Sequence, residues 1–169
     1  LQKEYPHFKY FHKKESISII ENSDQAILNS SGKYVCFMGD DDGVSGHIVD
    51  CVKWMEEKNI DVLKSTSALY IWPDSDKPGL LNKSSSLSLK KYTGSITQVD
   101  PIVALKKMLS RGGAGLFDMP KVYNGIAKRE TLNKIKEITG TFFPGPSPDI
   151  ANAVALCFVT KKYVVIDFP

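Results

Sequence analysis

The stretch "KYVCFMGDDDGV", residues 33–44, decides how the rest of the chain is interpreted. Its first half, residues 33–38, is rich in aromatic and β-branched residues and has a glycine on either side, which predicts a buried strand. Three consecutive aspartates, Asp40, Asp41 and Asp42, follow the carboxyl end of that strand. Ligands of open α/β sheets bind in the crevice outside the carboxyl ends of the strands. The sequence therefore predicts a binding site at these aspartates.

Carboxylates this close together repel one another unless a cation lies among them. Oxygen ligands suit Mg²⁺, Mn²⁺ or Ca²⁺. A Ca²⁺ EF-hand loop does not fit, because placing Gly43 at its invariant glycine position puts Met38 at the first ligand position and Val49 at the last. A Mg²⁺-type ion held by one or two carboxylates and by substrate phosphates does fit. The alternative is a structural acidic turn that leads into a helix.

Composition limits the classes of partner. The 169 residues, 42% hydrophobic and 24% charged, are typical of one globular domain that spans residues 1–169. A net charge of +3 is too small to indicate a nucleic-acid partner, but it is compatible with phosphate-bearing ligands or with peripheral association at an anionic membrane surface. Three cysteines without a CxxC pair predict buried thiols in a reducing, cytoplasmic compartment.

Hydrophobic periodicity predicts strands and helices in regular alternation. Strands are expected over residues 16–20, 33–38, 61–72, 121–127 and 162–167, and helices over residues 23–29, 45–59, 101–111 and 131–139, with a last helix opening at residues 147–149. Asp100 and Pro101 supply an N-cap and a first-turn proline for the third of these helices. Such alternation predicts an α/β three-layer sandwich with a mostly parallel central sheet.

A second candidate site lies in "FFPGPSPDIANAVAL", residues 142–156. Asp149 falls in the first turn of a predicted helix, just after Pro148. A carboxylate there is often structural, because the unpaired N–H groups and the dipole of the helix stabilise it. The functional alternative is a general base that a rigid helix end presents to an attacking hydroxyl.

With both sites in view, the chain resembles the family 2 glycosyltransferases, which have the nucleotide-diphospho-sugar-binding GT-A fold. The resemblance is carried by "ENSDQAILNSSGKYVCFMGDDDGV", residues 21–44, with weaker support from "VYNGIAKRETL" and "PSPDIANAVAL". The positions that fit the family pattern ahead of its acidic DxD-type motif are Asn22, Gly32, Tyr34, Val35, Phe37 and Met38. The resemblance spans most of the chain and is most specific up to Asp42.

The resemblance implies an inverting sugar transferase of bacterial polysaccharide or cell-surface glycan assembly. Asp40, Asp41 and Asp42 would hold the Mn²⁺ or Mg²⁺ that bridges the phosphates of a UDP- or GDP-linked donor. The DxD spacing favours Asp42 and Asp40 as metal ligands, whereas alignment with the usual motif favours Asp41. Asp149 would match the catalytic base that deprotonates a hydroxyl of a saccharide or lipid-linked acceptor.

Two departures from the family pattern bear on this interpretation. The family usually has Asp where this chain has Gly39, which leaves the ligating members of the run open. The family also opens with a strand, a helix and a second strand that form the nucleoside pocket, and nothing here corresponds to them. We therefore expect a GT-A-like domain that lacks its N-terminal segment and that binds nucleotide poorly.

Other residues carry weaker predictions. Lys128 and Arg129 follow a predicted strand and are candidates to contact the donor diphosphate, although a solvated surface position is the more common explanation for such residues. Trp72 is a candidate to stack on an acceptor sugar, with packing as the alternative. The loop of residues 74–95 is where acceptor specificity is expected.

Two other classes of function remain open. A nucleotidyl- or phosphoryl-transferring Mg²⁺ enzyme would also use clustered aspartates, but "RGGAG", residues 111–115, does not form the GxxxxGK[ST] phosphate loop. A non-catalytic module that binds a divalent metal or a nucleotide would need the aspartates but not Asp149.

Overall fold

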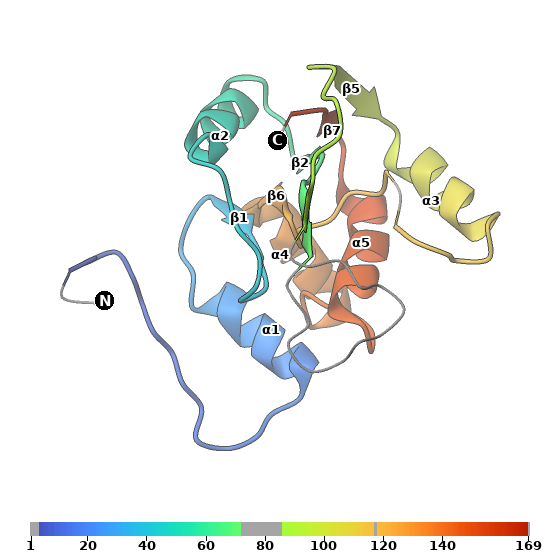
Figure 1. The fold of residues 1–169 in the computed structure, drawn as a ribbon. Helices are drawn as coiled ribbons and strands as arrows, with labels where there is room; N and C mark the ends of the chain where they lie inside the picture. Colours follow the sequence, from blue (N-terminus) through green and yellow to red (C-terminus); the bar gives the residue numbers. More distant parts are fainter. Residues whose placement is uncertain (1–3, 72–85, 117, 169) are drawn as a thin grey trace, which may run out of the picture.

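The computed structural model describes residues 4–71, 86–116 and 118–168. These ranges contain five helices and seven strands, and their arrangement is drawn in Figure 1. The helices are α1 (Ile19–Leu28), α2 (Ile48–Glu57), α3 (Pro101–Leu109), α4 (Arg129–Thr139) and α5 (Pro148–Val159). The strands are β1 (Tyr34–Cys36), β2 (Val62–Ser65), β3 (Leu69–Ile71), β4 (Ser86–Ser88), β5 (Ile96–Val99), β6 (Gly125–Lys128) and β7 (Tyr163–Ile166). The predicted α/β class is confirmed.

The central sheet has five strands in the order β1-β6-β2-β7-β5. Only β2 and β7 pair in parallel, while β6 is antiparallel to both of its neighbours and β5 is antiparallel to β7. The prediction of a mostly parallel sheet is therefore wrong: the sheet is mixed. Because β1 and β2 both run antiparallel to β6 between them, β1, β2 and β7 end at the same edge of the sheet.

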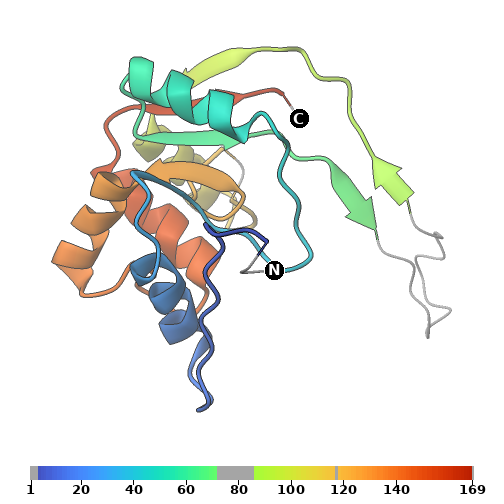
Figure 2. The same cartoon turned by 90° about the vertical axis from the view of Figure 1, so that its left-hand side faces the viewer.

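Helices cover both faces of this sheet, as Figure 2 shows. On one face, α2 contributes Met55 to a core that also contains Leu63 of β2 and Val164 of β7. On the other face, α1, α4 and α5 enclose a larger core around Tyr163 of β7, and α3 packs against α5 at its side. Alternate residues of a strand point to opposite faces, so Val62 and Leu63 enter the two different cores.

Short-range signals explain where the helices begin and end. Asp100 Oδ1 accepts hydrogen bonds from the N–H groups of Ile102 and Val103, which confirms the predicted cap of α3. Gly140 ends α4 in the left-handed conformation, with φ of 82°. The strand predicted over residues 16–20 is wrong, because Ser18 Oγ accepts the N–H of Glu21 and starts α1 at Ile19.

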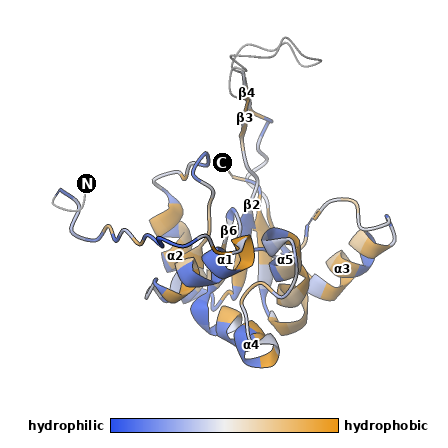
Figure 3. Cartoon of the chain, turned by 90° about the horizontal axis from the view of Figure 1, so that it is seen from below, coloured by the Kyte–Doolittle hydropathy of each residue, from blue (hydrophilic) through white to orange (hydrophobic). Residues whose placement is uncertain are grey.

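The segment after β2 differs from the predicted single strand. β2 ends at Ser65, and β3 then pairs with β4 as a two-stranded hairpin, which extends away from the helices and sheet in Figure 3. β5, over Ile96–Val99, adds an edge strand that the sequence analysis did not assign. Trp72 and most of the predicted specificity loop, residues 72–85, lie outside the described residues. None of the described helices has the length and apolar character needed to cross a bilayer.

Candidate functional site

The three aspartates lie between β1 and α2, in a segment that we call the aspartate loop, residues 39–43. Asp42 folds back on Gly39: its Oδ2 accepts the Gly39 N–H at 3.0 Å, and its own N–H donates to the Gly39 carbonyl at 3.4 Å. Asp42 is half-buried, whereas Asp40 and Asp41 are exposed. The loop is thus a closed turn in which one carboxylate supports the backbone and two face solvent.

Tyr123, which the sequence analysis did not single out, lies beside this turn. Tyr123 and Phe37 are partners in an isolated parallel β-bridge. In this bridge the Phe37 N–H donates to the Val122 carbonyl at 3.1 Å, and the Asn124 N–H donates to the Phe37 carbonyl at 2.9 Å. The rings of Phe37 and Tyr123 are 5.8 Å apart between centroids. The bridge continues the pairing of β1 by one residue beyond Cys36 and places Tyr123 beside the aspartate loop.

Gly39 leaves the space that the tyrosine hydroxyl occupies. A Cβ at this position would lie 2.7 Å from Tyr123 Oη and 2.8 Å from Asp41 Oδ1. Distances below 3.0 Å are essentially never seen for a real Cβ, so any larger residue must displace one of these groups. The local packing therefore explains why position 39, which departs from the glycosyltransferase pattern, is a glycine. The Tyr123 hydroxyl and the Asp41 carboxylate approach it too closely for a side chain, and its φ is not unusual.

The electrostatic surroundings of Tyr123 link the two predicted carboxylate sites. Burial raises the pKa of the Tyr123 hydroxyl, and the negative charge and hydrogen bonding of Asp42 raise this pKa further. The charges of Asp41 and Asp149 act on the same hydroxyl in the same direction. The Val122 N–H, next to this tyrosine, donates to Asn152 Oδ1 at 3.3 Å, which ties this segment to α5, the helix that carries Asp149.

Asp149 lies in the first turn of α5, as predicted. The N-cap residue of this helix, Ser147, makes no side-chain capping bond to the helix; its hydroxyl instead donates to Asp149 Oδ1 at 2.6 Å. Asp149 as a whole is half-buried. A carboxylate held by one hydroxyl is suited to accept a proton from a bound molecule.

Lys128 is not brought to the aspartates. It pairs with Tyr34 across β1 and β6, at the start of β1, whereas the aspartates follow the other end of that strand. Its side chain is only 12% exposed, and Nζ contacts Asn59 Oδ1 at 2.5 Å and Asp61 Oδ1 at 3.2 Å. The lysine is held in an ion pair within the fold.

Arg129, the residue after Lys128, is also held by contacts within the fold. Its guanidinium donates to the carbonyl of Gly32 at 2.6 Å, the hydroxyl of Ser30 at 2.7 Å and the carbonyl of Ile27 at 3.3 Å. These contacts join the start of α4 to the end of α1. The structure gives both cations structural partners and leaves their predicted diphosphate contact without geometric support.

A different lysine lies at the carboxyl edge of the sheet. Lys64 of β2 pairs with Gly125, two residues along the chain from Tyr123. Burial lowers the pKa of its ammonium group, the charge of Asp118 opposes this, and the charges of Lys121 and Lys90 lower the pKa further. In the sequence, Lys64 stands inside the predicted strand of residues 61–72, and no motif marks it as a site residue.

The donor set agrees with a Mg²⁺-type ion and not with a closed metal cage. Within residues 4–71, 86–116 and 118–168, no three His, Cys, Asp or Glu side chains are grouped tightly enough to hold a metal by themselves. Mg²⁺ is usually held by one or two carboxylates together with water and substrate phosphates, and it does not need such a cage. Asp41 and Asp42 each have a carboxylate oxygen close to the same point beside Gly39 as the Tyr123 hydroxyl, and they fit this mode of binding.

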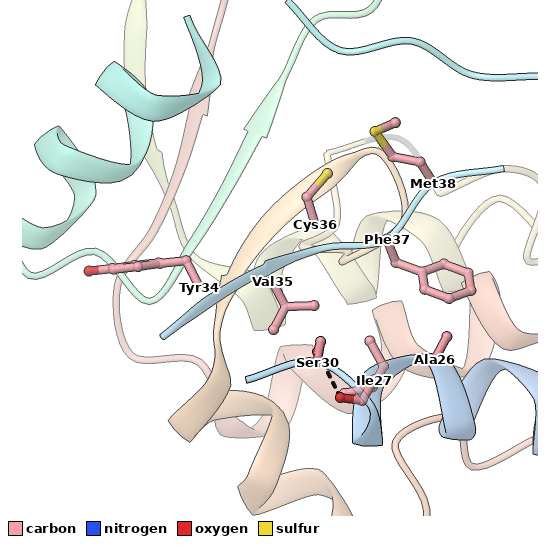
Figure 4. Close-up of a pocket in the computed structure, with 8 residues that line it drawn as sticks. All are labelled: Ala26, Ile27, Ser30, Tyr34, Val35, Cys36, Phe37 and Met38. Carbon is pink, nitrogen blue, oxygen red and sulfur yellow. Dashed lines mark hydrogen bonds between the residues drawn. The ribbon is translucent and has the colours of Figure 1, made fainter. Parts of the chain in front are cut away.

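A pocket of about 330 Å³ lies between α1 and β1. Figure 4 shows Val35 and Phe37 pointing toward α1, while Cys36 and Met38 point to the other side of the strand. The lining is mainly apolar, and the Ser30 hydroxyl is bonded to the Ile27 carbonyl at 2.7 Å. The pocket contains none of the candidate carboxylates, so we do not assign it to their chemistry.

With this geometry established, we compared the chain with known proteins. No family model, no curated protein and no solved structure matches it.

Proposed function

We propose that the chain is a metal-assisted inverting glycosyltransferase domain of GT-A-like fold, which transfers a sugar from a nucleotide diphosphate to an acceptor hydroxyl. The observation that supports this most is the position of Tyr123: its hydroxyl, Asp41 Oδ1 and Asp42 Oδ2 lie around one point beside Gly39. The N–H of the preceding residue, Val122, donates to Asn152 of α5, the helix whose first turn contains Asp149. A diphosphate-binding metal and a general base must lie within one substrate's length for such a reaction. The aspartates also follow the carboxyl end of β1, at the sheet edge where β2 and β7 end as well.

Asp149 is the proposed general base. It accepts the proton of the acceptor hydroxyl while the hydroxyl oxygen attacks the anomeric carbon from the face opposite the donor phosphate. The new C–O bond forms as the bond to the diphosphate breaks, and the nucleoside diphosphate leaves with the electron pair. One displacement of this kind inverts the anomeric configuration. The half-buried Asp149 is what a bound acceptor would contact.

Asp41 and Asp42 are the proposed ligands of Mn²⁺ or Mg²⁺. The metal, when bound, supplies Lewis-acid neutralisation of the charge that develops on the leaving diphosphate. The Gly39 N–H already holds the Asp42 carboxylate in place, so this ligand does not have to become ordered when the metal binds. Asp40 is exposed and belongs to the same run of aspartates, so it remains a candidate third ligand of the metal.

The partners that follow are a UDP- or GDP-linked sugar and a saccharide or lipid-linked acceptor. Lys64, at the same sheet edge, adds a cation that suits a phosphate-bearing donor. A lipid-linked acceptor would bring the domain to the cytoplasmic face of a membrane. The pattern of the residues 21–44 segment, with its Gly-x-Tyr strand and acidic loop, supports this choice of substrate class.

The experiment that tests the proposal is donor turnover. We expect Mn²⁺-dependent release of UDP or GDP from a panel of nucleotide sugars, and loss of this release when EDTA removes the metal. Nucleotide binding without release, at every donor and with saccharide acceptors present, would favour the non-catalytic module instead.

A further inference from the structure

The position of Tyr123 is fixed by its own backbone. Residues 121–125 form a tight turn in which the Gly125 N–H donates to the Val122 carbonyl at 3.2 Å. Asn124 has φ of 53°, and a Cβ at Gly125 would lie 2.2 Å from the Lys121 carbonyl oxygen, so only glycine fits there. The Asn124 N–H also donates to the Phe37 carbonyl at 2.9 Å, so this turn is held to the end of β1.

The phenol ring is fixed as well. It contacts Phe37, whose ring packs in turn against Phe143, with centroids 5.4 Å apart. Phe143 is buried in the core between the sheet and the helices α1, α4 and α5. A row of three aromatic rings therefore connects the rigid core to the hydroxyl at the aspartate loop.

The hydroxyl reaches the point where the loop closes. The position that a Gly39 Cβ would take lies 2.7 Å from Tyr123 Oη, 2.8 Å from Asp41 Oδ1 and 3.2 Å from Asp42 Oδ2. The Gly39 N–H already donates to Asp42 Oδ2 at 3.0 Å. The tyrosine hydroxyl and one oxygen of each carboxylate thus all lie within 3.2 Å of one point beside Gly39.

We propose that Tyr123 is the positioning residue of the metal site: its hydroxyl holds the Asp42 carboxylate against Gly39 and so fixes the orientation in which Asp41 and Asp42 receive the metal. This inference rests on the metal-dependent transfer proposed above, which does not itself require the tyrosine. Groups that hydrogen-bond metal-ligating side chains commonly change metal affinity by about 10- to 100-fold when they are removed. Tyr123 is not proposed to contact the substrate.

The test is Tyr123→Phe, which removes one oxygen and keeps the ring that packs on Phe37. We expect Mn²⁺ affinity, measured from the free-Mn²⁺ electron paramagnetic resonance signal in the presence of UDP or GDP, to fall about tenfold. We also expect faster hydrogen exchange of the Gly39 amide by NMR. Tyr34→Phe is the matched control, since that hydroxyl, at the other end of β1, is buried and unpaired within the described part of the chain.

A double-mutant cycle tests the contact itself. Gly39→Ala places a methyl group where the hydroxyl lies, so it should weaken Mn²⁺ binding strongly in the wild-type background. The same substitution should cost less in Tyr123→Phe, because the oxygen that it would meet at 2.7 Å is gone. Additive effects of the two substitutions would contradict the proposed contact.

The two proposals fail in different ways. If the wild type binds Mn²⁺ with a nucleotide diphosphate, but Tyr123→Phe matches it in affinity and in Gly39 exchange, the positioning role is wrong and the transferase proposal stands. If the wild type binds no Mn²⁺ with either nucleotide, both proposals are wrong.

Discussion

Phe37 and Tyr123 face each other across a parallel β-bridge, with their ring centroids 5.8 Å apart. Phe37 precedes the aspartate loop, and Tyr123 precedes β6. This single contact is how the fold joins the carboxyl end of β1 to the turn before β6, beside the start of α5. The predicted metal loop follows Phe37, and the Val122 N–H, next to Tyr123, donates to Asn152 of α5, the helix that carries the predicted base.

Asp149→Asn removes the proposed base and keeps the size of the side chain. We expect turnover to fall by a factor on the order of 10² to 10⁴, the usual contribution of a general base, while Mn²⁺-dependent binding of the donor is kept. Paired rate and binding measurements on one protein preparation check this. Asp50→Asn is the control, because Asp50 is also an acidic first-turn residue, on α2, and its side chain is 72% exposed. Equal loss of binding and turnover would argue against a base at position 149.

Two isoleucines on α4 test the packing. Ile135 is 1% exposed and Ile138 is 74% exposed, although helical spacing predicts both on the buried face. Ile135→Ala should lower the free energy of unfolding by about 2–5 kcal/mol, because it leaves a cavity. Ile138→Ala should change it by no more than about 0.5 kcal/mol, since nothing is uncovered. Urea unfolding of the two variants measures both changes in the free energy of unfolding. Similar losses of stability in the two variants would place Ile138 in a core or an interface.

Asp61 provides a test through pH. Burial acts to raise the pKa of this carboxyl, but hydrogen bonds from the Lys162 N–H, the Lys128 ammonium and the Lys161 N–H outweigh burial and lower it. Its contribution to stability is therefore present above the unfolded pKa of about 3.9 and is lost as pH falls through the lower folded value.

Asp61→Ala should consequently destabilise the wild-type fold at pH 7 by about 2 kcal/mol, since charged hydrogen bonds are lost. The difference between variant and wild type should shrink as pH falls below about 4. Urea unfolding midpoints of the wild type and of Asp61→Ala, recorded from pH 7 to pH 3, measure this difference. A difference that stays constant over this range would show that the charge of Asp61 does not contribute to stability.

The sequence predicted the local parts of the fold well. The Asp100 cap, the glycine end of α4, the strand before the aspartates and the helix that carries Asp149 all have signals within a few residues, and all are confirmed. Strand direction has no such local signal. Alternation of strands and helices suggested parallel pairing, but β6 enters from the tight turn at residues 121–125 and runs antiparallel.

The candidate site was predicted in part. The three aspartates and Asp149 were chosen from their types and positions, but whether they meet depends on contacts between distant segments. Tyr123 was hidden inside a predicted strand, residues 121–127, and its role follows only from the turn that it occupies. Lys128 and Arg129 look like free cations in the sequence, yet partners more than 60 residues away hold each of them.

The most direct test of the central claim is calorimetric titration of UDP and GDP into this chain, with and without Mn²⁺, for the wild type and for Asp42→Ala. We predict binding of at least one nucleotide that requires Mn²⁺ and disappears in Asp42→Ala. Binding that is indifferent to Mn²⁺ and to the substitution, or no binding of either nucleotide, would contradict a metal-diphosphate site and leave the aspartate loop as a structural turn.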